Sequence, residues 1–183
     1  MNSRIEALAL IHQSCWDQLG QAVRDKGHAW RVMGLATVDG ERADLRSVVL
    51  REVDAAAREL IFFTDARSPK VAQIEAQPLA TLLAWSEPLG WQLRLRVQLS
   101  VAVSGLAVSS RWARLKMTPA AHDYLSPLPP GAPVDHYLPE RASREHFAVL
   151  SAEVQAIDWL ELHADGHRRA VFDAAGQGHW VTP

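Results

Sequence analysis

The chain has 183 residues, of which 19 are basic and 21 acidic, so its formal net charge is −2. With 48% hydrophobic and 22% charged residues, the composition excludes a disordered chain, a collagen-like chain and a strongly basic nucleic-acid-binding module. The single cysteine, Cys15, excludes an internal disulfide and a multi-cysteine metal site, and it is typical of a reducing compartment. No apolar run approaches membrane-spanning length and no signal-peptide core follows Met1. We therefore expect a cytoplasmic protein of one domain, residues 1–183, without a metal site.

The N-terminal part of the chain predicts a helix followed by a β-hairpin. Apolar residues recur at three- and four-residue steps over residues 3–26, which predicts an amphipathic helix capped by Ser3. Two apolar segments, 30–38 and 45–53, then flank an Asp-Gly pair, which is typical of a tight hairpin turn. A third strand is expected at residues 59–64.

The middle of the chain predicts a short helix and two further strands. Ser68-Pro69-Lys70 places a capping hydroxyl before a proline at the first helical position. Residues 79–85 are expected to form a strand. From Trp91 to Val103 apolar and polar residues alternate without interruption, which predicts a long strand with one buried and one polar face.

The rest of the chain predicts mostly strands. The expected segments are a helix near 109–115, a proline-rich loop over 126–139, a short helix over 143–150, and strands over 154–162, 168–172 and 179–181. Most strands follow one another without crossover helices, so the predicted fold is mainly β with flanking helices. We expect its sheet to be mainly antiparallel and closed into a small barrel over about residues 28–183.

Two sets of polar residues suggest binding chemistry. Ser68, Lys70 and the free backbone N–H groups of their helix suit a phosphate, although an isolated motif of this kind is common. Gln92, Arg94 and Arg96 lie side by side on the polar face of the long strand. Such a row is typical of a solvated face; a module for single-stranded nucleic acid is the alternative, and the acidic overall balance argues against it.

Five segments in this order resemble the pyridoxamine 5′-phosphate oxidase family. They are Arg46-Ser47-Val48-Val49-Leu50-Arg51, Phe62-Phe63-Thr64-Asp65, Ser68-Pro69-Lys70-Val71-Ala72-Gln73-Ile74 with Pro78, Trp85 with Trp91-Gln92-Leu93-Arg94, and Trp159…Arg168-Arg169…Trp180…Pro183. The corresponding family patterns are R-x-V-L-L-K, F-Y-T-N, S-R-K-A-x-Q-I with N-P, W-x(5)-R-Q-V and W…R…W-x-(x)-R-L-x-P. The resemblance covers about residues 28–183.

The resemblance implies an antiparallel six-stranded split β-barrel, a homodimer, and FMN bound without a covalent bond at the subunit interface. In this family Arg46 and Lys70 would bind the FMN phosphate, Thr64 and Ser68 would add hydroxyl donors, and Gln92 would contact the polar edge of the flavin ring. Trp159 and Arg169 would come from the partner subunit. The full set of implied cofactor-binding residues is Arg46, Ser47, Val48, Val49, Leu50, Arg51, Phe63, Thr64, Ser68, Lys70, Gln92, Trp159 and Arg169.

The sequence also departs from the family pattern. Pro69 replaces an arginine of the phosphate site, and a Gln-Ser pair that contacts FMN in the oxidase is lost near Leu128 and Pro129. The three residues that hold the phosphate of the oxidase's substrate, a Tyr, an Arg and a Ser, align with Trp112, Lys116 and Ala120.

Three functions follow from these features as expectations. The first is an FMN-dependent oxidoreductase that acts on a small organic substrate by hydride transfer at flavin N5, with oxygen or a nicotinamide nucleotide as second partner. The second is a non-catalytic FMN- or haem-binding protein, in which His122, His136 or His146 would supply a haem ligand. The third is pyridoxamine 5′-phosphate oxidase activity itself. No side chain stands out as a catalytic acid or base.

Overall fold

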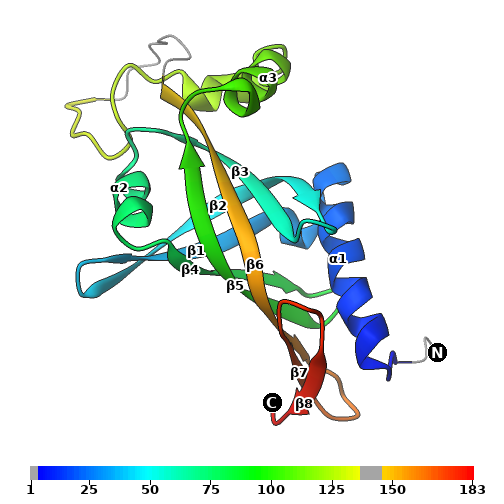
Figure 1. Ribbon diagram of the computed structural model, residues 1–183. Coiled ribbons are helices and arrows are strands. Elements are labelled where there is room, and N and C mark those ends of the chain that lie inside the picture. Colours follow the sequence, from blue (N-terminus) through cyan, green and yellow to red (C-terminus); the bar gives the residue numbers. More distant parts are fainter. Residues whose placement is uncertain (1–3, 137–145) are drawn as a thin grey trace.

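The computed structural model describes residues 4–136 and 146–183, and its centre is a β-barrel (Figure 1). Six strands form the barrel: β1 (Val32–Asp39), β2 (Arg42–Asp54), β3 (Glu59–Asp65), β4 (Leu79–Ser86), β5 (Trp91–Ala102) and β6 (Phe147–Glu161). They pair antiparallel in the order β3-β2-β1-β4-β5-β6, and pairing of β3 with β6 closes the ring. The expected antiparallel six-stranded split barrel is therefore confirmed.

Strand β6 joins the barrel to a C-terminal extension. Its first part pairs with β3 as far as Glu153, and its last part, from Ile157, pairs with β7 (Arg168–Phe172). The register against β5 shifts around Gln155, which is the extra residue of a β-bulge and lies where β6 exchanges one neighbour for the other. The short strand β8 (Gly178–Val181) extends the sheet beyond β7.

Strand β5 has the predicted two faces. Leu93, Leu95, Val97 and Leu99 point into the barrel and are almost fully buried, whereas the polar residues between them lie on the outer face. Because a slip of one residue would exchange these faces, the alternation fixes the register of β5 against β4 and β6.

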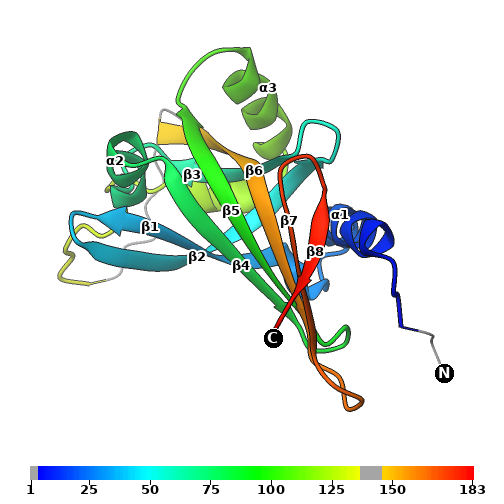
Figure 2. The same ribbon diagram turned by 60° about the horizontal axis from the view of Figure 1, so that its bottom comes forward.

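Helix α1 (Leu8–Arg24) packs its apolar stripe on the barrel (Figure 2). Ile11, Cys15 and Leu19 are fully buried in the same core as the barrel strands. The prediction of a helix from residue 3 was wrong at its start: the helix begins at Leu8 without a side-chain cap, and Ser3 lies outside the described residues.

The prediction of a short helix over 143–150 was also wrong where it can be compared. Residues 143–145 lie outside the described part, and β6 begins at Phe147. Phe147, Ala148, Val149 and Leu150 are all buried, because the barrel core covers one face and a second apolar cluster with α3 (Leu106–Leu115) covers the other. A strand buried on both faces loses its two-residue alternation, which is why the pattern was misread.

The remaining helical segments are short, and the first is a 3₁₀ helix at Ala29–Arg31, just before β1. Helix α2 (Pro69–Ala76) forms where the Ser-Pro-Lys motif predicts it, with Pro69 in its first turn. A 3₁₀ helix, Pro119–Tyr124, follows α3. The proline-rich segment has no regular structure through residue 136, and residues 137–139 lie outside the described range. None of the helices in residues 4–136 and 146–183 has the length and hydrophobicity needed to cross a membrane.

Candidate functional site

Lys70 lies at the start of α2, and in the described part of the chain its ammonium group has only hydroxyl groups as hydrogen-bond partners. Its Nζ donates to Oγ of Ser68 at 2.6 Å and to Oγ1 of Thr64 at 3.1 Å. Within the described residues Lys70 has no ion pair with a carboxylate. The Ser68 hydroxyl makes no capping hydrogen bond to α2, so the predicted cap instead accepts from the ammonium group.

Arg46 of β2 is held beside this group by four neighbours, one of which is the backbone carbonyl oxygen of Leu35, 3.2 Å from Nη1. Its Nη1 donates to Oγ1 of Thr37 at 2.5 Å, and its Nη2 donates to Oε1 of Gln73 at 2.9 Å. Its Nη2 also pairs with the carboxylate of Asp44. The structure brings four of the predicted residues together at one end of the barrel: Arg46, Thr64, Ser68 and Lys70. We call them the phosphate-site residues.

The electrostatics of the phosphate-site residues favour the binding of an anion. Burial lowers the pKa of Lys70, and the nearby charge of Arg46 lowers it further, while Asp65 and Asp44 oppose the shift. A hydrogen bond from Gln73 and the contact with Arg46 hold the pKa of Asp44 below its usual range, so this carboxylate offsets one of the two cations. A dianionic phosphate would complete the hydrogen bonds of Lys70 and oppose its repulsion from Arg46, so the residues present fit the phosphate of FMN.

The remaining predicted residues of β2 and β3 fall on two faces. Ser47 is exposed and Val49 half-buried on the outer face, whereas Val48 and Leu50 point into the core. Val48 and Leu50 can therefore offer a ligand their backbone only. Phe63 lies on the outer face of β3, and the guanidinium of Arg51 lies 5.7 Å from the centre of its ring.

The three other predicted residues lie elsewhere, where β5, β6 and β7 pair. Gln92 of β5 is opposite Leu160, which is opposite Arg169 of β7. We call Gln92, Trp159 and Arg169 the hairpin group. In Figure 1 the β7–β8 end of the sheet lies far from α2. One chain therefore does not bring the hairpin group close to the phosphate-site residues.

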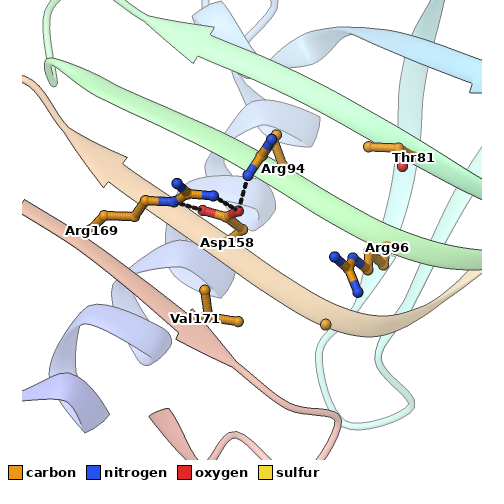
Figure 3. A pocket seen from close by; sticks show the side chains of 7 residues that line it. Thr81, Arg94, Arg96, Asp158, Arg169 and Val171 are labelled. Atoms are coloured by element: carbon orange, nitrogen blue, oxygen red, sulfur yellow. Dashed lines mark hydrogen bonds and ion pairs between the residues drawn. The ribbon is translucent and has the colours of Figure 1, made fainter. Parts of the chain in front are cut away.

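Arg169 lines a cavity of about 320 Å³ on the outer face of the sheet (Figure 3). Its Nε and Nη2 donate to the two carboxylate oxygens of Asp158 at 2.9 and 2.7 Å, and Arg94 also pairs with Asp158. Burial raises the pKa of Asp158, but these hydrogen bonds outweigh it and keep the pKa below its usual range. Arg96 lines the same cavity and has no ion pair among the described residues.

Trp159 is fully buried, with its ring 5.3 Å from that of Trp91 and 6.3 Å from that of Trp180. Its Nε1 has no hydrogen-bond partner among the described residues. The guanidinium of Arg168 lies 5.7 Å from the Trp159 ring. In this conformation Trp159 packs in the core and reaches no ligand-accessible surface.

Sequence reasoning missed several residues that support the site. Thr37, Asp44 and Gln73 all contact Arg46, and Gln73 also donates to Asp44 at 3.0 Å. Gln73 belongs to the quoted Ser-Pro-Lys segment, so its motif was the available signal. Thr37 and Asp44 emerge only from the hairpin register, which sets them opposite each other.

Arg67 was missed as well. It pairs with Asp65 at 2.7 Å and donates to the carbonyl oxygens of Ser126, Pro127 and Leu128. The proline-rich loop, where the resemblance predicts the loss of a family Gln-Ser pair near Leu128 and Pro129, is thus attached next to the phosphate-site residues.

The three positions aligned with the oxidase's substrate site lie near one another, on the last turn of α3 and just after it, but in different environments. Trp112 is buried against Phe147, Lys116 is exposed, and Ala120 lines a cavity beside β3. Of the histidines considered as haem ligands, His122 and His136 are exposed and His146 directly precedes β6.

Comparison with known proteins identifies the class. A sequence model of the FMN-binding domain of pyridoxamine 5′-phosphate oxidase matches residues 13–103. This range is about half of the chain and contains all four phosphate-site residues. The chain belongs to the pyridoxamine 5′-phosphate oxidase-related family of FMN-binding proteins. FMN is the cofactor of the matched domain. A search of curated proteins found no significant match.

Solved structures share the fold at low sequence identity. A pyridoxamine 5′-phosphate oxidase-related, FMN-binding protein of Nostoc punctiforme is 24% identical, with a TM-score of 0.72, and the alignment covers 93% of this chain and 96% of that one. PhzG of Burkholderia lata, solved with tetrahydrophenazine-1-carboxylic acid, is 16% identical, with a TM-score of 0.74 and coverage of 100% and 99%. A haem-binding protein of Mycobacterium smegmatis is 15% identical, with a TM-score of 0.56 and coverage of 95% and 61%.

Proposed function

We propose that the protein is a homodimeric flavoprotein that binds FMN without a covalent bond and oxidises or reduces a small organic substrate. The observation that carries the proposal is the set of phosphate-site residues: a partly buried lysine, whose ammonium group has only hydroxyl partners among residues 4–136 and 146–183, lies beside an arginine. Bound FMN would supply hydride transfer at its N5 atom, with oxygen or a nicotinamide nucleotide as second partner. The buried, unpaired Cys15 is compatible with a cytoplasmic location, which is part of the proposal.

The dimensions of β2 support a position for the cofactor. Residues 46 and 51 are separated by roughly 16 Å along the strand at about 3.3 Å per residue, a length comparable with an extended FMN molecule. The phosphate would lie at Arg46, and the ring would lie near Val49, Arg51 and Phe63. Ser47 and Val49 would contact the cofactor from the outer face, and the backbone of Val48 and Leu50 would offer hydrogen bonds.

A second copy of the chain would complete this site. The hairpin group lies far from the phosphate-site residues within one chain, so a two-fold axis is the simplest way to bring Gln92 and Arg169 to the cofactor. The outer face of β1, β2 and β4 supports an interface, because Val32, Leu45 and Leu83 are 53%, 66% and 40% exposed there. Contiguous exposed apolar side chains of this kind mark interaction surfaces. Trp159 would need to leave the core to reach a ligand, so its role in binding is the least supported part of the set.

The test is a titration of the purified protein with FMN, followed by visible absorbance and flavin fluorescence. We expect one FMN per chain. Lys70→Ala should weaken binding by about 1.5–3 kcal/mol, roughly 10- to 150-fold, the scale of a lost charge-assisted hydrogen bond. Arg42→Ala, at an exposed position of β2 whose side chain has no hydrogen bond among the described residues, is the matched control. A protein that shows no saturable change in flavin absorbance or fluorescence, and that is colourless after unbound FMN is removed, would refute the proposal.

Two further measurements separate the alternatives. Oxygen consumption or nicotinamide oxidation by the FMN-loaded protein with candidate substrates distinguishes an enzyme from an FMN-binding sensor. Titration with haemin, followed by its Soret band, tests the haem alternative. Pyridoxamine 5′-phosphate is the least favoured substrate, because Trp112 and Ala120 lack the hydroxyl groups that the family's Tyr and Ser offer to its phosphate.

A further inference from the structure

Asp158 of β6 lies between two arginines on the outer face of the sheet (Figure 3). In the pairing of β5 with β6 it is directly opposite Arg94. In the pairing of β6 with β7 it is diagonal to Arg169, because its direct neighbour there is Val171. Opposite and diagonal side chains on one face of a sheet are within reach of one another. The register of three strands therefore brings two cations to one carboxylate.

Both oxygens of this carboxylate accept hydrogen bonds. Nε and Nη2 of Arg169 donate to Oδ1 and Oδ2 at 2.9 and 2.7 Å, and Arg94 donates to Oδ2. Two parallel hydrogen bonds of this kind fix the direction of a guanidinium. Burial raises the pKa of Asp158, but the hydrogen bonds from the two arginines outweigh burial and keep the pKa below its ordinary value. The carboxylate is therefore charged at neutral pH.

The charge of Asp158 compensates only part of the positive charge around it. Arg96 lines the same cavity and has no ion pair among the described residues. Among the described residues that line the cavity, Asp158 is the single acidic one, so three arginines face one carboxylate and leave a formal charge of +2. Since the Asp158 side chain is only 19% exposed, salt screens its field less than that of a surface carboxylate. Loss of this one charge would change the field around Arg169 substantially.

We propose that Asp158 is a positioning residue that acts through Arg169: it fixes this arginine, offsets its charge, and thereby lowers the reduction potential of bound FMN. The inference rests on the proposed function, in which Arg169 approaches the cofactor of a second copy. A flavin that accepts a hydride gains one negative charge, and a cation near the ring stabilises this charge. An arginine already paired with a carboxylate does so less than a free arginine.

The test compares the unmodified protein with Asp158→Asn, which keeps the shape of the side chain and one acceptor oxygen. Fluorescence titration gives the affinity for oxidised FMN, and anaerobic reduction beside a reference dye at pH 7 gives the potential of bound FMN. The potential depends on the ratio of the affinities for reduced and oxidised FMN, so a loss common to both forms does not change it. We expect Asp158→Asn to raise this ratio about tenfold, or about 30 mV for a two-electron couple. An unchanged or lower potential overturns the inference.

Two further variants show whether Asp158 acts through Arg169. Arg169→Gln should lower the potential, and Asp158→Asn made in the Arg169→Gln protein should change the affinity ratio by less than about threefold. Arg94→Gln, at a more exposed position where folding is not at risk, leaves the carboxylate to Arg169 alone and should reduce the ratio about threefold. An effect of Asp158→Asn that is as large without Arg169 as with it overturns the inference.

Glu153→Gln is the matched control, because it removes the same charge from the same strand. Glu153 is exposed and pairs with Arg58 at 3.3 Å, outside the hairpin group, so the potential should stay unchanged. A rise as large as that in Asp158→Asn would assign the effect to net charge and overturn the inference. If the unmodified protein binds no FMN, the proposed function fails and this inference fails with it. If it binds FMN tightly and neither Asp158→Asn nor Arg94→Gln changes the potential, this inference alone fails.

Discussion

The side-chain amide of Gln73 holds the guanidinium of Arg46 in place, with Nη2 of Arg46 donating to Oε1 of Gln73 at 2.9 Å. The same oxygen accepts the hydroxyl of Thr37 at 2.6 Å. Gln73 is buried in α2, and Thr37 is buried in β1. The direction of the Arg46 side chain is thus determined by helix α2 and by β1, the strand that precedes its own, so Gln73 is a positioning residue for the phosphate-site residues.

Substitution of Gln73 by methionine, which has a similar length and no amide, should weaken FMN binding about tenfold. The physical reason is that Arg46 would keep only Thr37, the Leu35 carbonyl and Asp44, and would shift toward the Asp44 carboxylate. Loss of the buried hydrogen bonds should also lower the free energy of unfolding by about 1–3 kcal/mol. FMN titration and urea unfolding measure the two effects. Equal FMN affinity in Gln73→Met and the unmodified protein would contradict the positioning role.

The affinity for FMN should fall as the pH rises through the lowered pKa of Lys70. Burial and the charge of Arg46 lower this pKa below its ordinary value, which is about 10.4. An uncharged lysine cannot pair with a phosphate, so FMN affinity is greatest below the lowered pKa and declines above it. In the free protein the sign is opposite: between the lowered and the ordinary pKa the unfolded chain binds more protons, so Lys70 makes stability rise with pH.

The measurement is the FMN dissociation constant between pH 7 and 10.5, with Lys70→Arg as the matched variant. Because arginine stays charged over this range, its dissociation constant should change much less than that of the unmodified protein. If the FMN affinity of both proteins declines in parallel as the pH rises, the pH dependence belongs to another group.

Substitution of Leu83 by glutamate should dissociate the proposed dimer and weaken FMN binding together. Leu83 faces outward from β4 next to Leu45, and both side chains lie against Gly34 of β1. A charge placed there would have to be desolvated in an interface between two copies. Light scattering gives the oligomeric state, and FMN titration gives the affinity. Leu106→Glu, at an 82% exposed position of α3, is the control and should change neither. A dimer that persists in Leu83→Glu would exclude this face as the interface.

Local sequence patterns were sufficient for most elements of the fold. The alternation over residues 91–103 gave β5 and its buried face, and the Ser-Pro-Lys signal gave α2. Closure of the barrel could not be read in this way, because β3 pairs with β6 across more than 80 intervening residues and no local pattern encodes that pairing. Phe147–Leu150 was misassigned for a related reason: its burial on both faces depends on α3 and the barrel core, which meet only in the folded chain.

The same division applies to the candidate site. Lys70 and Ser68 are two residues apart, so the motif placed both at the start of α2, but it predicted a capping hydrogen bond from Ser68 where the structure has a contact between Ser68 and Lys70. The support of Arg46 by Thr37, Asp44 and Gln73 depends on the β1–β2 register and on the packing of α2, and the sequence did not predict it. The resemblance had already assigned Trp159 and Arg169 to the partner subunit, whereas the distance of Gln92 from the phosphate-site residues emerges only from the folded chain.

Protonation of Glu161 should destabilise the protein at acidic pH. Glu161 is 6% exposed; it accepts from Nε of Arg4 at 2.8 Å, Nε of Arg168 at 2.9 Å and Nε1 of Trp91 at 3.3 Å. Burial raises its pKa, but the two arginines and Trp91 outweigh burial, and the pKa lies below its ordinary value. A carboxylate with a lowered pKa stabilises the folded state fully above the unfolded-state pKa of about 4.3. That contribution is lost as the pH falls through the folded-state value.

Glu161→Gln removes this charge while keeping the side chain's shape. At pH 7 the variant should be less stable by about 1–3 kcal/mol, because Arg4 and Arg168 lose charge-assisted hydrogen bonds in a part-buried position. Urea unfolding from pH 7 to 3 measures the difference. Since protonation makes the natural residue neutral as well, the two proteins should converge in stability at the acidic end. A difference that stays constant over the whole range would mean that Glu161 contributes through packing rather than through its charge.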